Sequence, residues 1–263
     1  MPALQVPRRL EHHARIPQHR LSRPRHLKLL DDFPTREALL SLVQKMPEQE
    51  LRELDALLEG TRVAWAPQTG PQLAAFCSRA DILLYGGQAG GGKTDLLLGV
   101  AGLQHIRSVI FRRVSPSLRA LLDRSREIFN PEYTPLGLDS LNESLQRWRL
   151  DWATPNARQI EFGSLEHEKD VLKHQGQPRD LHAFDEVTEF TEYQFRYIIG
   201  WNRSTRPGQR CRVLAASNPP TTEDGRWVVR YWAPWLDEAH PNPAQPGELR
   251  WFTTLSGKDV EVA

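Results

Sequence analysis

The sequence is poor in cysteine, in lysine and in long apolar runs. Its 263 residues include two cysteines, Cys77 and Cys211, which are too few and too far apart for a disulfide framework or a cysteine-held metal cluster. No apolar run approaches the roughly 20 residues of a membrane helix, and no secretory signal opens the chain. We therefore expect a cytoplasmic protein without membrane contact. The length allows one large domain with appendages.

The scarcity of lysine leaves arginine as the main cation. Only six of the 34 basic residues are lysines, so 28 are arginines. Arginine suits phosphate and DNA backbones, but a GC-rich genome produces the same bias, and both explanations stay open. The net charge of +1 excludes a polycation.

One glycine-rich stretch predicts a nucleotide site. Residues 87–94 (GQAGGGKT) match the phosphate-binding pattern G-x-x-x-x-G-K-[ST], between an apolar strand at 82–85 and a Leu-rich helix at 95–103. Glycines let successive N–H groups converge on anionic oxygens, and the helix adds its positive end. We predict that Lys93 reaches the β- and γ-phosphates of ATP and that the Thr94 hydroxyl binds Mg²⁺. The predicted ligands of the nucleotide are Gly87, Gly90, Gly91, Gly92, Lys93, Thr94 and Asp95.

A glutamine lies upstream of this loop. Gln72 precedes a short predicted helix over 73–78. Its amide offers a donor and an acceptor together, which suits the edge of an adenine base. Contact with adenine and a purely structural role are equal alternatives for Gln72.

A second motif places two carboxylates at the end of a strand. Residues 181–186 (LHAFDE) are mostly apolar and end in Asp185 and Glu186. After a phosphate loop, this pattern predicts that Asp185 holds Mg²⁺ through water and that Glu186 polarises the attacking water as a general base. The adjacent glutamate favours a hydrolase over a small-molecule kinase.

A third strand also ends in polar side chains. Residues 213–220 (VLAASNPP) carry Ser217 and Asn218 at the predicted sheet edge. We predict that these two residues sense the γ-phosphate or its water and couple hydrolysis to movement.

Three other segments have less specific patterns. Residues 147–152 and 158–162 predict a β-hairpin inserted on the core, and residues 226–235 are rich in tryptophan and arginine. Core packing of these tryptophans is favoured over stacking on nucleic-acid bases. Arg112 and Arg113 end the strand at 108–111 and could face nucleotide or DNA, or cap a helix.

The three motifs together resemble the large terminase subunit of tailed bacteriophages, the ATPase that drives DNA into a procapsid. The likeness covers about residues 65–252. The segments that carry it are Gln72, residues 84–87 (LYGG), residues 90–94 (GGGKT), residues 184–186 (FDE) with Thr188 and Phe190, and residues 217–220 (SNPP) with Trp227 beyond.

The resemblance implies a fold and a set of partners. The fold would be an α/β P-loop NTPase of the additional-strand, catalytic-glutamate type, with a mostly parallel central sheet flanked by helices. The partners would be double-stranded DNA, a portal protein and a small terminase subunit. The active form would be a homo-oligomeric ring in the cytoplasm of a phage host.

The chain departs from the family in its arginines. Gln88 and Ala89 stand where many members carry an arginine in the phosphate loop, and Gln175 precedes Gly176 where many carry another. An arginine finger would have to come from elsewhere. The candidates are Arg179, Arg196 and Arg203.

The expected organisation has four parts, and we predict no nuclease activity in this chain. They are a basic arm (1–30), a helical arm (31–62), the P-loop ATPase domain (63–236), and a Pro-rich linker (237–263) toward an absent C-terminal nuclease domain.

Two alternative functions stay open. A helicase-like or other nucleic-acid translocase would share the same ATPase core. A nucleotide-binding assembly module would bind ATP without turnover.

Overall fold

The computed structural model describes residues 47, 49, 65–88, 90–129, 139–151, 157–253 and 257–263. The chain divides into two units, Met1–Gly60 and Thr61–Ala263. The predicted basic arm lies outside the described residues, and so does nearly all of the predicted helical arm.

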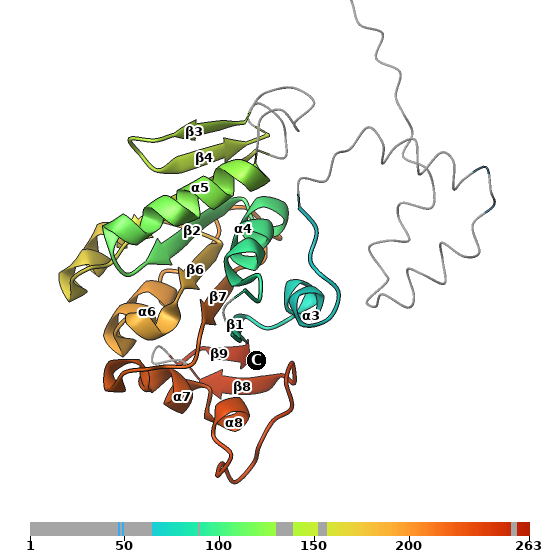
Figure 1. Ribbon diagram of the computed structural model, residues 1–263, viewed down its shortest axis with the longest axis vertical. Helices are drawn as coiled ribbons and strands as arrows, with labels where there is room; N and C mark the ends of the chain where they lie inside the picture. Colours follow the sequence, from blue (N-terminus) through green and yellow to red (C-terminus); the bar gives the residue numbers. More distant parts are fainter. Residues whose placement is uncertain are drawn as a thin grey trace, which may run out of the picture. The chain divides into compact units, whose positions relative to one another are not determined.

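The second unit is built on a mixed β-sheet (Figure 1). Within the described residues the strand order is β3-β4-β5-β2-β6-β7-β1-β9-β8. The run from β5 through β2, β6, β7 and β1 to β9 is parallel, whereas β3, β4 and β8 pair antiparallel with their neighbours. The strands are β1 Ile82–Gly86, β2 Arg107–Arg112, β3 Ser140–Asn142, β4 Arg147–Leu150, β5 Arg158–Ser164, β6 Leu181–Asp185, β7 Arg212–Ser217, β8 Arg250–Thr253 and β9 Asp259–Val262.

Strand β7 decides the fold class. It lies between β1, which leads into the phosphate loop, and β6, which ends at Asp185 directly before Glu186. An extra strand between these two is the defining feature of additional-strand P-loop NTPases. The predicted fold class is therefore confirmed.

Helices cover both faces of the sheet. The α-helices are α3 Pro71–Cys77, α4 Lys93–Gln104, α5 Leu118–Ile128, α6 Glu192–Ile199, α7 Trp227–Tyr231 and α8 Ala233–Leu236, and the 3₁₀ turns are η2 Ser115–Ser117, η4 Glu168–His174, η5 Val187–Glu189 and η6 Glu223–Gly225. None of the helices in the described ranges is both long enough and apolar enough to cross a membrane.

The core has two layers because successive side chains of a strand point to opposite faces. In β2, Ile110 packs in the layer that contains α3, α4 and α5, whereas Val109 and Phe111 pack in the layer that contains α6 and α7. In β7, Leu214 and Val213 divide in the same way. Both faces are covered, which explains why these strands read as continuous apolar runs.

The prediction of a linker over 237–263 is wrong for the second half of that segment. Strands β8 and β9 belong to the sheet, and β9 pairs parallel with β1 through Ile82 and Val262. Val260 and Val262 are buried. The alternation of residues 259–262 (DVEV) is the short signal of a half-buried strand, and the prolines at 241–246 obscured it.

The predicted hairpin needs a correction too. Strands β4 and β5 are antiparallel, as expected. However, β5 also pairs with the whole of β2, from Arg107 with Gln159 to Arg112 with Ser164. Strand β5 is thus part of the main sheet rather than of an insertion on it.

The aromatic segment 226–235 packs in the core. Trp227 and Trp232 are buried, and their indole N–H groups donate to the backbone oxygens of Phe190 (2.8 Å) and Ala263 (3.2 Å). These two tryptophans confirm the core-packing interpretation.

Candidate nucleotide site

The phosphate loop connects β1 to α4 at the carboxyl edge of the parallel strands (Figure 1). Gly90 (φ 84°) and Gly92 (φ 66°) have left-handed backbones, which glycine adopts at least cost. Helix α4 begins at Lys93, directly after Gly92. The loop and the positive end of the helix therefore face the edge where ligands bind in sheets of this kind.

Gln72 braces the end of this loop. The residue is 3% exposed, and its Nε2 donates to the backbone oxygen of Gly92 at 2.8 Å. Its Oε1 accepts the backbone N–H of Gln68 at 2.6 Å. Both ends of the amide are thus engaged inside the chain, and adenine contact by Gln72 stays a prediction.

The ammonium group of Lys93 lies inside the loop. Its Nζ donates to the backbone oxygens of Gly87 (3.1 Å) and Gln88 (2.9 Å) and to Asn218 Oδ1 (2.8 Å). Lys93 is buried. The ammonium group of Lys93 therefore links the phosphate loop to Asn218, which directly follows β7.

The side chains of Thr94 and Asp185 bring two oxygen-bearing groups together. The Thr94 hydroxyl donates to Asp185 Oδ2 at 3.1 Å. Asp185 Oδ1 is buried and has no hydrogen-bond partner among the described residues. A hydroxyl beside a carboxylate with an unpartnered oxygen is a donor set that Mg²⁺ accepts, so these residues fit the predicted metal.

Arg112, at the end of β2, contacts the same carboxylate. Its Nε and Nη2 lie 2.8 and 2.6 Å from Asp185 Oδ2. Burial raises the pKa of Asp185, while the positive charge of Arg112 and the bond from Thr94 oppose that rise. The sequence placed Arg112 at a strand end, where it could face nucleotide or DNA or cap a helix. It did not predict the contact with Asp185, because nothing in the sequence shows that β2 lies next to β6.

Glu186 is held by the end of β7. Its carboxylate accepts the backbone N–H of Asn218 (3.2 Å), the Nδ2 of the same residue (3.3 Å) and the hydroxyl of Ser217 (3.3 Å). The Ser217 hydroxyl also lies 2.7 Å from the Thr188 hydroxyl. Asn218 thus contacts both Lys93 and Glu186, so the predicted coupling residues bridge the loop and the predicted base.

The backbone of Glu186 is unusual. It has φ 58° and ψ 60°, in the left-handed region that residues with a β-carbon avoid. This conformation turns the chain directly after β6, which ends at Asp185. Strain of this kind is common at functional sites.

Asp95 does not point its carboxylate into the site. Arg124 of α5 holds it with two bonds of 2.7 Å, from Nε to Oδ1 and from Nη2 to Oδ2. The Asp95 side chain therefore ties α4 to α5. Any contact with a nucleotide would fall to its backbone.

The three arginines named as finger candidates have other partners. Arg179 pairs with Glu161, Arg196 pairs with Glu192 (2.7 Å), and Arg203 donates to a backbone oxygen (2.9 Å). Among the described residues, none of the three forms a hydrogen bond or an ion pair with Lys93, Thr94, Asp185 or Glu186.

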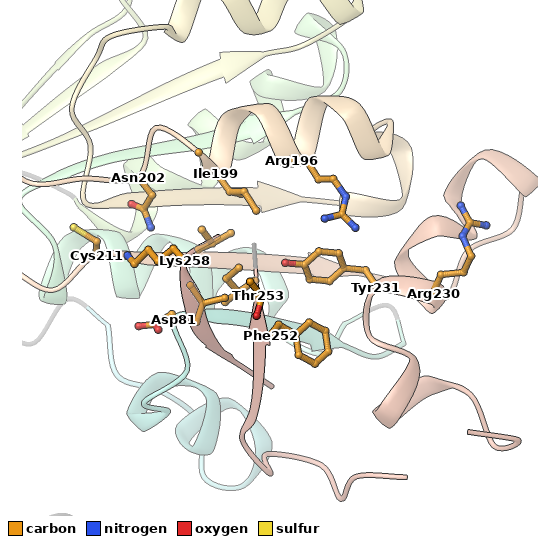
Figure 2. Close-up of a pocket in the computed structure, with 14 residues that line it drawn as sticks. Asp81, Arg196, Ile199, Asn202, Cys211, Arg230, Tyr231, Phe252, Thr253 and Lys258 are labelled. Atoms are coloured by element: carbon orange, nitrogen blue, oxygen red, sulfur yellow. The ribbon is translucent and has the colours of Figure 1, made fainter. Parts of the chain in front are cut away.

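A cavity of about 400 Å³ lies at the opposite end of the strands (Figure 2). Val213, near the start of β7, lines it together with two arginines, Arg196 and Arg230. Both arginines are within ion-pair distance of Glu192 (2.7 and 3.6 Å), and Arg196 also lies 5.0 Å above the ring of Tyr231. This cavity is separate from the phosphate loop.

These features define a class of protein. A phosphate loop, a strand that ends at Asp185 directly before Glu186, and an additional strand between them describe the additional-strand P-loop fold.

Comparison with solved structures shows which known proteins share this fold. A variant of the large terminase ATPase domain of Thermus phage P74-26 shares 15% identity with this chain at a TM-score of 0.50, over 76% of this chain and 83% of that one. The large terminase of another thermophilic bacteriophage shares 12% identity at a TM-score of 0.46 over 59% of this chain. The large terminase of bacteriophage HK97 shares 13% identity at a TM-score of 0.46 over 60% of this chain. The chain spans 40% of the former protein and 34% of the HK97 protein. No family model and no curated protein matches the sequence. The chain therefore has the fold of a phage large terminase ATPase domain.

Proposed function

We propose that this chain is the ATPase motor of a DNA-packaging machine, which hydrolyses ATP to translocate double-stranded DNA into a viral procapsid. The observation that carries the ATPase part is the contact of Asn218 with both Lys93 (2.8 Å) and Glu186 (3.3 Å). This contact brings Lys93, the proposed phosphate-binding cation, close to Glu186, the proposed general base. The DNA part is supported by the motif resemblance and the shared fold.

The residues have distinct roles in the proposed reaction. Lys93 binds the β- and γ-phosphates, and Thr94 and Asp185 hold Mg²⁺, which neutralises phosphate charge when bound. Glu186 accepts the proton of the attacking water. Asn218 holds the Glu186 carboxylate, so a change at the γ-phosphate alters contacts at the end of β7.

The proposed partners follow from the same resemblance. They are double-stranded DNA, a portal protein, a small terminase subunit and further copies of this chain in a ring. Their place of action would be the cytoplasm of a phage host.

The test compares ATP turnover and ATP binding in the wild type and in Glu186→Gln. Glu223→Gln is the matched control, because that carboxylate lies on the surface with a side chain 79% exposed. We expect Glu186→Gln to lose about 10²–10⁴-fold in turnover while Mg²⁺-dependent binding of a fluorescent ATP analogue persists. Wild-type turnover in Glu186→Gln would show that Glu186 is not the base.

The DNA arm of the same experiment separates the alternatives. Turnover is measured alone, with double-stranded DNA and with single-stranded DNA, at high protein concentration so that rings can form. Stimulation by double-stranded DNA is the expected result. Stimulation by single strands alone would favour a helicase-like translocase, and tight ATP binding without turnover would favour an assembly module.

A further inference from the structure

We propose that Arg112 is the arginine that stabilises the transferred phosphoryl group within the same subunit, held on Asp185 until the metal and nucleotide bind. The inference rests on the proposed ATPase function and goes beyond it. It assigns a catalytic role to a residue that the three motifs leave out.

The position of Arg112 follows from the sheet. Strands β2 and β6 are parallel neighbours, with Phe111 paired to Phe184, so residues 112 and 185 end adjacent strands at the same edge. The guanidinium binds one oxygen, Asp185 Oδ2, through two nitrogens. The Arg112 side chain is 20% exposed, so it is not fully enclosed by its neighbours.

Arg112 lies on the oxygen that Thr94 also contacts. Thr94 Oγ1 is 3.1 Å from Asp185 Oδ2, and Arg112 Nη2 is 2.6 Å from it. Thr94 and Asp185 are the two side chains that fit Mg²⁺. A divalent cation held there would repel a guanidinium at this distance, because like charges repel strongly in a partly desolvated site. The contact between Arg112 and Asp185 would therefore weaken once these residues held the metal.

The bound nucleotide supplies a new partner for the released arginine. Thr94 and Asp185 would hold the metal, and its positive charge would favour the phosphates of ATP at this edge. The γ-phosphoryl oxygens thus come to the same edge as Arg112. A planar guanidinium suits these oxygens because its donors match them two at a time.

The nearby arginines in the described residues are engaged elsewhere. Arg113 donates to the backbone oxygen of Leu165, and Arg124 is held by Asp95. Gln88 stands in the loop where an arginine could otherwise act. Arg112 is the arginine that the structure places in contact with the Mg²⁺-binding carboxylate.

The proposed step balances without a further reactant. The water oxygen forms a bond to the γ-phosphorus while the bond to the β–γ bridging oxygen breaks. ADP leaves with that electron pair, and Glu186 takes the proton of the water. Arg112 stabilises the negative charge on the equatorial oxygens of the phosphoryl group during transfer.

The experiment measures affinity for Mg²⁺·ADP with and without aluminium fluoride, which mimics the phosphoryl group in transfer. The variants are Arg112→Ala and Arg112→Lys, with the exposed Arg119→Ala as the control for loss of one positive charge. Labelled ADP gives the affinities, single-turnover kinetics give the rate, and thermal melting reports folding.

We expect Arg112→Ala to bind Mg²⁺·ADP within about threefold of the wild type but to lose the added affinity from aluminium fluoride. Its turnover should fall by about 10³-fold or more, as for other arginine fingers, and Arg112→Lys should recover part of the loss. Arg119→Ala should behave as the wild type.

Other outcomes overturn the inference. If Arg112→Ala keeps the wild-type gain from aluminium fluoride, another residue stabilises the phosphoryl group. If affinity for Mg²⁺·ADP falls as much as affinity for the analogue, Arg112 serves only to organise the metal site. A wild type that shows neither turnover nor a gain from the analogue would overturn the proposed function as well.

Discussion

Replacing Gly92 by alanine tests the contact between the phosphate loop and Gln72. A β-carbon at Gly92 would lie 2.4 Å from Gln72 Nε2, which is far inside contact distance. The backbone at Gly92 is also left-handed, with φ 66°. Gly90 is left-handed as well (φ 84°), but a β-carbon there meets no atom of the described residues within 4 Å. The two glycines therefore share a left-handed backbone but differ in whether an added β-carbon would clash with a neighbour.

The magnitudes follow from these geometries. A left-handed backbone costs a residue with a β-carbon about 1–2 kcal/mol, and both variants lose this amount. In Gly92→Ala the Gln72 amide must also move. This movement breaks two hydrogen bonds, the one that Gln72 donates to the backbone oxygen of Gly92 and the one that it accepts from the backbone N–H of Gln68. At roughly 0.5–1.5 kcal/mol for each hydrogen bond, this adds about 1–3 kcal/mol.

The assay is urea unfolding of four proteins besides the wild type: Gly90→Ala, Gly92→Ala, Gln72→Ala and the double variant of positions 72 and 92. Gly92→Ala should lose about 2–5 kcal/mol of unfolding free energy and Gly90→Ala about 1–2 kcal/mol. The double variant should be more stable than additivity predicts by about 1–3 kcal/mol, because Gln72→Ala removes the atoms that clash.

Additive losses at positions 72 and 92 would refute this reasoning, since they would show that the two side chains do not meet. Equal losses in Gly90→Ala and Gly92→Ala would refute it in the same way. Binding of labelled ATP, measured alongside, should weaken more in Gly92→Ala, because Gly92 directly precedes Lys93 at the start of α4.

Two further predictions concern buried ionisable groups. Burial and the positive charge of Arg179 lower the pKa of His174 to about 4 and that of His182 to about 3. Unfolded histidine titrates near pH 6.5, so the unfolded chain binds more protons and the unfolding free energy should fall as the pH decreases from about 6.5 toward 4. His182→Leu should flatten this dependence in urea unfolding at several pH values, and an unchanged slope would contradict it. Asp180→Ala should cost about 3–5 kcal/mol in the same assay, because the buried Asp180 carboxylate accepts two backbone N–H groups and lies 3.1 Å from His105 Nδ1. Asp180→Asn should lose less, and a loss below about 1 kcal/mol for alanine would contradict the assigned role.

The core of the fold was predictable from local patterns. Apolar runs at 82–85, 108–111, 181–185 and 213–217 each became a parallel strand, because both faces of the sheet are covered. The polar residues at their ends then had to meet at one edge. The juxtaposition of Lys93, Asp185, Glu186 and Asn218 was therefore expected from strand polarity.

What the sequence could not supply was strand order. Arg112 contacts Asp185 only because β2 pairs with β6, and that pairing joins residues more than seventy positions apart. Strand β9 was missed for another reason, since four residues are too few to outweigh the prolines before them. The bracing of Gly92 by Gln72 depends on how α3 packs near α4, which no local pattern encodes.

The left-handed backbone of Glu186 has an evolutionary consequence. Glycine would hold φ 58° and ψ 60° at less cost than glutamate, so selection for stability alone would favour glycine here. Selection for hydrolysis would favour the carboxylate. Under the proposed function, position 186 is one where the chain gives up stability for activity, and a lineage that no longer needed turnover would be free to lose glutamate there before it lost the fold.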